Sequence, residues 1–231
     1  MQQSTTEKTT SMEYEKAIDY IDHLIQDGEL KLGSRLPAER AIAETLGIGR
    51  NSTREALSIL HGMGMIQRVQ GSGNYVTGDA HHAIRQICTM MLALGTITKK
   101  DVCEFRRTLE KSACMLLAAK GLPTDDRQRF SEILTAMETA GQKEQPLLDR
   151  DFHALLLKAT GNSLMITILE AVAEVYQEWI DIVIHKADDD QKTRLLAYHR
   201  GIVSALAEAD ADLALRFVDD HYDLIEEMLE L

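Results

Sequence analysis

Three histidines and one aspartate in the second half of the chain have spacings that suit metal binding. Asp149 and His153 are four residues apart, so on a helix they present a carboxylate and an imidazole to the same side. His199 and His221 each lie eleven residues from Asp210, and a helical hairpin that turns there brings them level. Such a group suits a divalent transition metal, with zinc as the first expectation and nickel or manganese as alternatives. The alternative for each histidine alone is a hydrogen-bonded core residue.

A second group of polar residues, in the first third of the chain, could read DNA. Arg50 and Arg54 are four residues apart and share one helix face, and a guanidinium can fork onto guanine edges or grip phosphate. Asn51 and Ser52 add hydrogen-bonding groups beside them. Taken alone, an arginine pair at this spacing is usually a solvated helix face, so the surrounding elements decide between the two interpretations.

Those elements are predicted to be a short helix, a turn, a second helix and a hairpin. Pro37 fixes φ and fits a first helical turn, apolar residues follow at helical spacing, and Gly47 is a C-terminal stop. A second helix begins at Arg50 with polar residues and continues with an apolar face. Strands are expected at 65–69 and 74–76, joined by a tight glycine-containing loop. The pattern predicts a winged helix-turn-helix that binds DNA.

Two runs in this stretch are LPAERAIAETLGIGRNSTREAL and GMGMIQRVQGSGNYV. They resemble the DNA-binding domain of the GntR family of bacterial transcription regulators, and the resemblance covers Glu13 to Thr77. Gly49 departs from the family pattern, because relatives often carry serine or threonine there, and a hydroxyl contact to phosphate is lost. The resemblance implies DNA contacts from both helices and the wing, at Arg40, Arg50, Asn51, Ser52, Arg54, Gln70 and Gly71.

From residue 80 onward helical periodicity replaces the strand signals. Few prolines interrupt it, and faces rich in Leu, Ala and Met with short turns predict an antiparallel bundle. The predicted fold class is therefore mainly α, an N-terminal winged helix-turn-helix with a small β-hairpin and a C-terminal bundle. Residues 1–12 are expected to be disordered and residues 13–78 to form the DNA-binding domain. Residues 79–231 are expected to form a helical domain that binds ligand and metal and forms the dimer. We expect six or seven helices in the bundle, at residues 80–94, 99–120, 124–140, 146–160, 163–186, 190–207 and 210–230.

Three runs in the bundle are EFRRTLE, DRDFHALLLKATGN and YHRGIVSALAEADADLALRFVDDHY. They are similar to the FCD domain, the helical effector-binding domain of the FadR subfamily, from Asp101 to the C-terminus. The resemblance implies that Arg106 reaches into an effector cavity, while Arg107 faces solvent. Asn162 is either an effector contact or a helix cap. In metal-containing members the ligands are an Asp and three His, which implies the four ligands Asp149, His153, His199 and His221.

Charge and length set limits on the partners. The chain of 231 residues carries 25 Lys and Arg against 37 Asp and Glu, and residues 1–78 hold 8 basic against 10 acidic residues. Affinity from phosphate contacts is then modest per subunit, which favours a homodimer on a palindromic operator. Without a long apolar run or a signal-peptide pattern, a cytoplasmic location and no membrane partner are expected. Three cysteines without metal-site spacing are expected to be reduced thiols.

The expected function is that of a DNA-binding transcription regulator, a repressor and not an enzyme. A small carboxylic acid bound at the metal site is expected to control the affinity for the operator. No catalytic residue is assigned. One alternative is a metal-dependent hydrolase that uses the same Asp and His residues to activate water. The other is a metal-free regulator that senses a fatty acyl thioester, as the namesake of the subfamily does.

Overall fold

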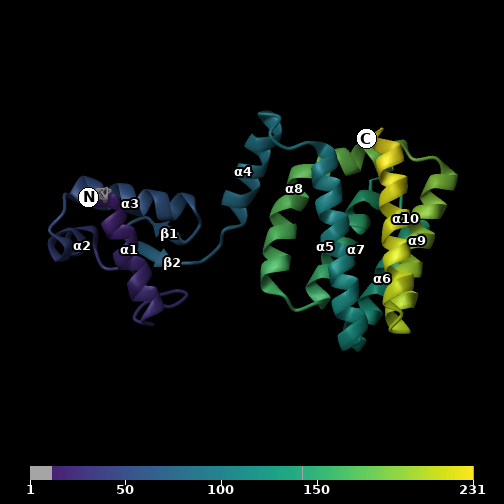
Figure 1. Ribbon diagram of the computed structural model, residues 1–231, viewed down its shortest axis with the longest axis horizontal. Coiled ribbons are helices and arrows are strands. Elements are labelled where there is room, and N and C mark those ends of the chain that lie inside the picture. Colours follow the sequence, from purple (N-terminus) through teal and green to yellow (C-terminus); the bar gives the residue numbers. More distant parts are fainter. Residues whose placement is uncertain (1–11, 142, 231) are drawn as a thin grey trace, which may run out of the picture. The chain divides into compact units, whose positions relative to one another are not determined.

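The computed structural model describes residues 12–141 and 143–230 of the chain (Figure 1). It contains two compact units, of which the first ends at Ala83 and the second begins at Ile84, five residues beyond the expected domain boundary. Residues 1–12 are expected to be disordered, and all of them except Met12 lie outside the described residues. Met12 directly precedes the first helix. In the described part of the chain, no helix is both long and apolar enough to cross a membrane.

The first unit consists of three helices and a β-hairpin (Figure 1). Strands β1 and β2 pair antiparallel, with Ile66 opposite Val76 and Val69 opposite Gly73. This is the winged helix-turn-helix that the sequence predicts. In chain order the elements are α1 (Glu13–Gln26), α2 (Glu39–Leu46), α3 (Arg50–Gly62), β1 (Ile66–Val69) and β2 (Gly73–Val76).

The core of this unit forms where the apolar helix faces meet the inner side of the hairpin. Ile21 of α1, Ile42 of α2 and Leu57 of α3 are fully buried together. Ile66 and Val76, which face each other across the hairpin, close the same core. Burial of each large aliphatic side chain contributes about 1.5–3 kcal/mol to stability, so these positions hold α3 in place.

The start of α2 differs from the prediction. The helix begins at Glu39, with Ala38 as an extended N-cap residue, and not at Pro37. The chain before it is extended because the Leu36 N–H donates a hydrogen bond to the Asn74 carbonyl of β2. Pro37 therefore joins a segment paired with the hairpin to the helix, instead of forming the first helical turn.

The turn between α2 and α3 is as predicted. Gly47 ends α2 in the left-handed region, with φ 64°, where a side chain would be strained. Its N–H donates to the Ala43 carbonyl, and α3 begins at Arg50 as expected. No helix was predicted for residues 13–26, and α1 is an addition that packs against α3.

In the described residues, the second unit contains α5 to α10 and all of α4 except its first three residues, and each helix end lies within one residue of the predicted one. In Figure 1, α5, α9 and α10 run side by side, and α10 contacts both of the others. Side-chain caps mark the starts of α5, α8, α9 and α10, as at α5, where Thr98 and Asp101 form a capping box. The helices are α4 (His81–Ala93), α5 (Lys99–Lys120), α6 (Thr124–Thr139), α7 (Gln145–Ala159), α8 (Ser163–Lys186), α9 (Asp189–Ala207) and α10 (Ala211–Leu229).

The main core of the bundle draws on α5, α6, α7, α9 and α10. Leu117, Phe130, Phe152, Leu206 and Tyr222 are all fully buried in one cluster. The rings of Phe130 and Phe152 meet edge to face, with centroids 5.2 Å apart. This packing fixes the register of α7 against its neighbours, and α7 carries the first two residues of the predicted metal site.

Candidate metal and effector site and DNA-contact surface

Helix α7 presents Asp149 and His153 to the interior of the bundle. Pro146 lies in its first turn, where a missing N–H costs nothing, and the helix runs on to Ala159. Because the two residues are one turn apart, both side chains leave the helix on the side that Phe152 also helps to bury. Both are buried. The predicted pairing of a carboxylate and an imidazole on one helix face is therefore present.

The hairpin of α9 and α10 brings the other two histidines to the same point. The Asp210 side chain accepts a hydrogen bond from the Leu213 N–H and so caps α10 at the predicted turn. The two helices approach closely at Gly201, where an added Cβ would lie 2.6 Å from the Phe217 ring. His199 and His221 are consequently level across the hairpin, as expected.

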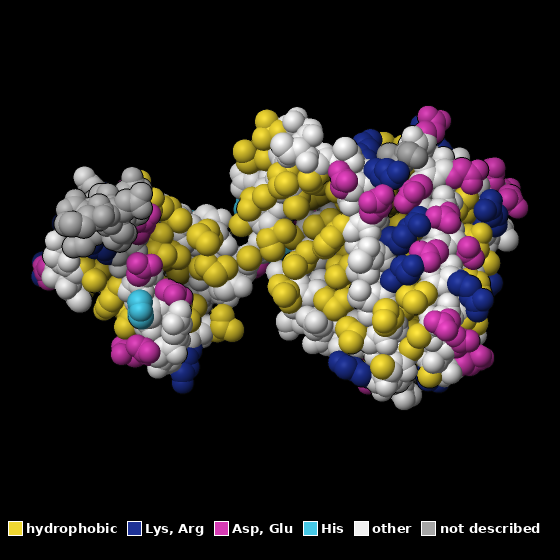
Figure 2. Space-filling view, viewed as in Figure 1, with side chains coloured by type: hydrophobic (Ala, Val, Ile, Leu, Met, Phe, Trp, Pro, Cys, Tyr) yellow, Lys and Arg dark blue, Asp and Glu magenta, His cyan; other side chains and the backbone are white. Residues whose placement is uncertain are grey.

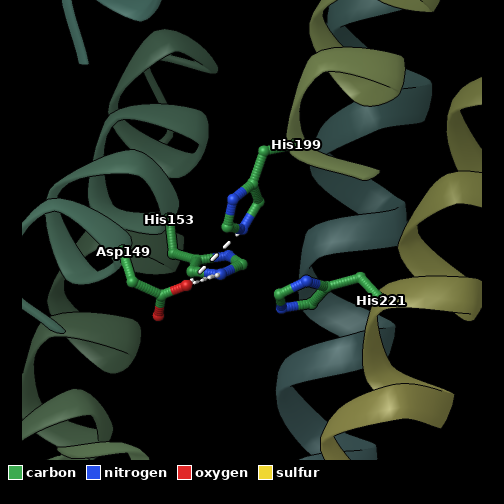
Figure 3. A group of neighbouring side chains, drawn as sticks. All are labelled: Asp149, His153, His199 and His221. Carbon is green, nitrogen blue, oxygen red and sulfur yellow. Dashed lines mark ion pairs between the residues drawn. The ribbon is translucent and has the colours of Figure 1, made fainter. Parts of the chain in front are cut away.

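Asp149, His153, His199 and His221 converge from three helices (Figure 3). One ligand atom from each lies within 4.8 Å of the others. The Asp149 Oδ1 atom is 3.6 Å from His153 Nε2 and 3.5 Å from His199 Nε2. Asp149 is 6% exposed and each histidine 2% exposed. A carboxylate and three imidazoles at these separations could hold a divalent metal ion.

The ring nitrogens of this group show an unusual lack of partners. His153 Nε2, His199 Nδ1, His199 Nε2 and His221 Nδ1 are all buried, and none has a hydrogen-bond partner among the described residues. A buried polar atom without a partner costs about 1–3 kcal/mol, so several at one point are unfavourable unless another species binds there. The donor set fits a metal ion, because neutral imidazole nitrogens and one carboxylate oxygen are ligands of zinc and related ions.

Glu110 of α5 belongs to the site and was not among the predicted residues. The carboxylate is fully buried and lies 2.8 Å from His153 Nδ1, and it accepts a 2.6 Å hydrogen bond from the Tyr222 hydroxyl. With a proton on Nδ1, His153 turns its unpaired Nε2 toward the other three ligands, an arrangement common around metal-binding histidines. The sequence signal was a glutamate one turn after Arg106, but nothing local shows that its partners lie on α7 and α10.

Arg106 reaches the same interior from α5. Its guanidinium lies 3.8 Å from the centroid of the Tyr176 ring and 3.6 Å from the Glu110 carboxylate, and the side chain is buried. The Nε atom has no hydrogen-bond partner within the described parts of the chain. A guanidinium held by stacking, with a free donor, is well suited to receive an anion.

Arg107 differs from its expected role, and Asn162 takes one of its two. Arg107 does not simply face solvent, because its guanidinium is half-buried and pairs with Asp223 and Glu226 of α10, at 2.7 and 3.1 Å. The exposed Asn162 uses its side-chain oxygen to cap α8, accepting from the Leu164 and Met165 N–H groups. Of its two predicted roles, the structure shows the helix cap.

The electrostatics of the site separate the histidines. Burial lowers the pKa of His153, but the carboxylates of Glu110 and Asp149 outweigh this effect and raise it to about 9. Burial lowers the pKa of His199 to about 4, and it lowers that of His221 as well. Burial alone would raise the pKa of Asp149, yet the nearby His153 holds it well below its usual range. The site therefore contains an ionised carboxylate facing two neutral imidazoles.

A cavity of about 420 Å³ leads to this group from the surface. Asp149 and His199 form part of its lining, together with apolar side chains such as Leu195 and Leu196 of α9. Small-molecule sites in proteins typically have volumes of about 300–1,000 Å³ and mostly apolar walls. The cavity is large enough for a small organic molecule that touches the buried group.

The predicted DNA-contact residues gather on the first unit. Arg40, Arg50, Asn51, Arg54, Gln70 and Gly71 are exposed and Ser52 is half-buried. Arg54 of α3 lines the same surface hollow as Gln70 and Gly71 of the wing loop. Helix α3, which is the recognition helix of the predicted motif, and the wing loop thus line one surface hollow.

Carboxylates of the same unit contact several of these residues. The Arg54 guanidinium lies 2.8 Å from Glu39, and Arg40 lies 3.1 Å from Glu44. Glu13 accepts hydrogen bonds from the Ser52 hydroxyl, at 2.9 Å, and from the Gly49 N–H, at 3.2 Å. The sequence does not predict the contact of Glu13. Its carboxylate accepts from backbone and side-chain groups at the start of α3, where the N-cap residue Gly49 has no side chain to do so.

A winged helix-turn-helix followed by a helical bundle whose cavity reaches a buried polar group fits a DNA-binding regulator that responds to a small ligand. Residues 13–76 match the family model described as bacterial regulatory proteins, gntR family, and residues 101–224, more than half of the chain, match the FCD domain. The chain belongs to the GntR family of bacterial transcription regulators and carries an FCD domain.

Similar proteins cover nearly the whole chain. The Glc operon transcriptional activator of Escherichia coli is 26% identical over 223 residues, which cover 93% of this chain and 88% of that protein. The HTH-type transcriptional regulator LutR of Bacillus subtilis is 29% identical over 217 residues, with coverages of 89% and 96%. Among solved structures, a GntR protein of Streptococcus agalactiae matches with a TM-score of 0.67 and 26% identity, over 93% of this chain and 99% of that one.

The family establishes the general activity. The protein is a DNA-binding transcription regulator and not an enzyme, so the hydrolase alternative is dropped. GntR regulators bind operator DNA through the N-terminal domain, and FCD domains bind small-molecule effectors. The buried Asp and three His are then part of an effector-binding domain.

Proposed function

We propose that this regulator is a repressor whose affinity for its operator is controlled by a small carboxylic acid bound at a metal site in the FCD domain. The observation that carries the proposal is the group of four buried ligand atoms within 4.8 Å, with imidazole nitrogens that have no hydrogen-bond partner among the described residues. Zinc is the first candidate for the metal, with nickel and manganese as alternatives. A metal-free regulator of acyl thioesters would leave these nitrogens unsatisfied.

Asp149, His153, His199 and His221 would hold the metal, and Arg106 would bind the effector carboxylate. A divalent metal supplies positive charge and coordination positions for the oxygens of an acid. Arg106 is already stacked on Tyr176 and keeps a free donor, so it loses little entropy on binding. One relative, 24% identical, is named a putative L-lactate dehydrogenase operon regulatory protein, so 2-hydroxy acids are the first acids to test.

A homodimer on a palindromic operator is the expected assembly. Helix α4 buries none of its residues in a single chain, and Ile87 and Met90 of α4 and Leu94 directly after it are 57%, 57% and 74% exposed at helical spacing. Figure 2 shows hydrophobic side chains gathered around α4 and α8. Such an apolar stripe supports association with a second copy, which would place two recognition helices on two half-sites. The protein would then act where its operator lies, in the cytoplasm.

The proposal requires reciprocal coupling between acid and DNA. If the acid binds the operator-free protein more tightly than the operator-bound protein, the operator must weaken acid binding by the same factor. Isothermal titration of the metal-loaded protein with the acid, with and without a saturating operator duplex, measures that factor directly. We expect weaker acid binding in the presence of operator, and equal affinities would reject the proposal. A reporter under the same operator gives the sign, since repression predicts higher expression when the acid is supplied.

A further inference from the structure

The buried charges of the helical unit lie around one point. In the described part of this unit, the buried charged and imidazole side chains are Arg106, Glu110, Asp149, His153, His199 and His221. A divalent metal with neutral imidazoles would bring two positive charges, and the arginine adds a third. The two carboxylates balance two of these three. A single positive charge is left over in an interior where an unbalanced charge is costly.

Glu110 determines the size of this surplus. Its carboxylate contacts a ligand, an arginine and a hydroxyl at once: His153 Nδ1 at 2.8 Å, Arg106 at 3.6 Å and the Tyr222 hydroxyl at 2.6 Å. It is fully buried, so water does not screen it. Without this carboxylate the surplus would be two positive charges. The four metal ligands would still be present, because they lie on α7, α9 and α10.

The route to the surface adds no positive surplus. The cavity lining contains Lys192, with Asp189 one turn earlier on α9, and Glu138. Glu138 is itself paired with Arg200. Basic and acidic groups thus offset each other near the mouth. A second carboxylate of the effector that reached the mouth would find no surplus positive charge to neutralise it.

We infer that the effector is a monocarboxylic acid with a single negative charge, and that Glu110 sets this preference against di- and tricarboxylic acids. This inference rests on the proposed function, because it needs a divalent metal and an acid in the site. One carboxylate neutralises the surplus charge, and a second leaves the interior with an excess negative charge. Glu110 is a positioning residue that acts through His153 and Arg106.

The test compares acids that differ in one charge. L-Malate and its C4 monoamide have the same 2-hydroxy acid head and nearly the same shape, and L-lactate is the smaller monoanion. Calorimetric titration of the zinc-loaded full chain with all three gives the dissociation constants. We expect the dissociation constant of the monoamide to be lower than that of malate by about tenfold or more. A difference of this size corresponds to one modest uncompensated charge interaction in a protein. Equal or tighter binding of malate would overturn the inference. If malate binds more tightly to the wild type and Lys192→Gln removes that advantage, the second carboxylate of malate lies at the cavity mouth.

A pair of variants separates charge from structure. Glu110→Gln removes the negative charge, and we expect the preference to shift toward malate by about tenfold at full metal loading. Tyr222→Phe removes a hydrogen bond to the same carboxylate without changing its charge, and the ratio should stay as in the wild type. A merely structural role for Glu110 would weaken both acids alike in either variant, which would contradict the inference. If Glu110→Gln does not fold, the wild-type comparison decides alone.

The outcomes distinguish this inference from the proposed function. Metal-dependent binding of both acids without a charge preference leaves the proposed function standing and rejects the monoanion. No metal and no acid binding in the wild type rejects both. Elemental analysis of each preparation shows which case applies.

Discussion

The two units of this regulator use their charged residues in opposite ways. In the DNA-binding unit, Arg40 and Glu44 form an ion pair with side chains 75% and 66% exposed. In the helical unit, Arg106 and Glu110 are also four residues apart on a helix, but their side chains are 4% and 0% exposed. An exposed pair is worth about 0–1 kcal/mol and is easily exchanged for a DNA phosphate. Buried charges have no water to replace a lost partner, so they depend on each other and on what binds.

This difference predicts local effects of substitutions on the DNA-contact surface and coupled effects in the buried site.

The largest effect is expected from a metal ligand. His199→Ala should lower zinc affinity more than about 100-fold, because loss of a residue that only orients a ligand already costs about 10–100-fold. Equilibrium dialysis against zinc with a competing chelator measures the change. The exposed His185 on α8 gives a matched control, and His185→Ala should leave the affinity as it is. Full zinc content in His199→Ala would show that the site is assigned wrongly.

Metal affinity should depend steeply on pH. In the metal-free protein the pKa of His153 is raised to about 9 and that of His199 lowered to about 4, so near neutral pH one proton must leave His153 before it can bind a metal. A folded-state pKa above the working pH means that affinity rises with pH, by about 100-fold from pH 6 to 8. Titrations in two buffers of different ionisation enthalpy should give about one proton released per metal. A flat profile would contradict the charge arrangement around His153.

A smaller effect is expected on the exposed surface of the first unit. Arg50→Ala should weaken operator binding by about 1–3 kcal/mol, as removal of a base or phosphate contact does. Metal content should not change. The control is Arg129→Ala, which removes an exposed arginine from α6 of the other unit. Fluorescence anisotropy with an operator duplex measures both, and an equal loss for Arg129→Ala would speak against a DNA contact at Arg50.

The smallest expected effect comes from packing between α9 and α10. Gly201→Ala places a Cβ 2.6 Å from the Phe217 ring, and overpacking costs about 1–3 kcal/mol against a helix-propensity gain of about 1 kcal/mol. We expect a net loss of up to about 2 kcal/mol in the free energy of unfolding, measured by urea denaturation of the metal-free protein. Gly62→Ala in α3, where nothing lies within 4 Å, should be neutral or slightly stabilising. A stabilised Gly201→Ala would mean that the two helices have room to separate.

Features set by nearby residues are the ones that the sequence predicts well. Several helix starts have local side-chain caps, such as Thr98 and Asp210, and each bundle helix lies within one residue of its predicted range. The histidines at equal distances from Asp210 are level for the same reason, because a hairpin of two regular helices fixes their heights.

Long-range contacts explain what the sequence does not predict. Glu110 meets His153 across 43 positions and Tyr222 across 112 positions of the chain, and no local pattern marks such pairs. From the sequence Arg107 is expected to face solvent, because its carboxylate partner Asp223 lies far along the chain on α10. At Pro37 the hairpin keeps the chain extended and overrides the local preference of a proline for a first helical turn.

The central claim is that a metal organises the effector site. Elemental analysis of the purified protein, with calorimetric titration of the as-isolated and chelator-stripped forms against a panel of carboxylic acids, tests it most directly. We predict about one zinc, nickel or manganese per chain, and acid binding that is lost on stripping and restored by the same metal. A protein that carries no metal, or that binds acids equally well after stripping, would contradict the claim.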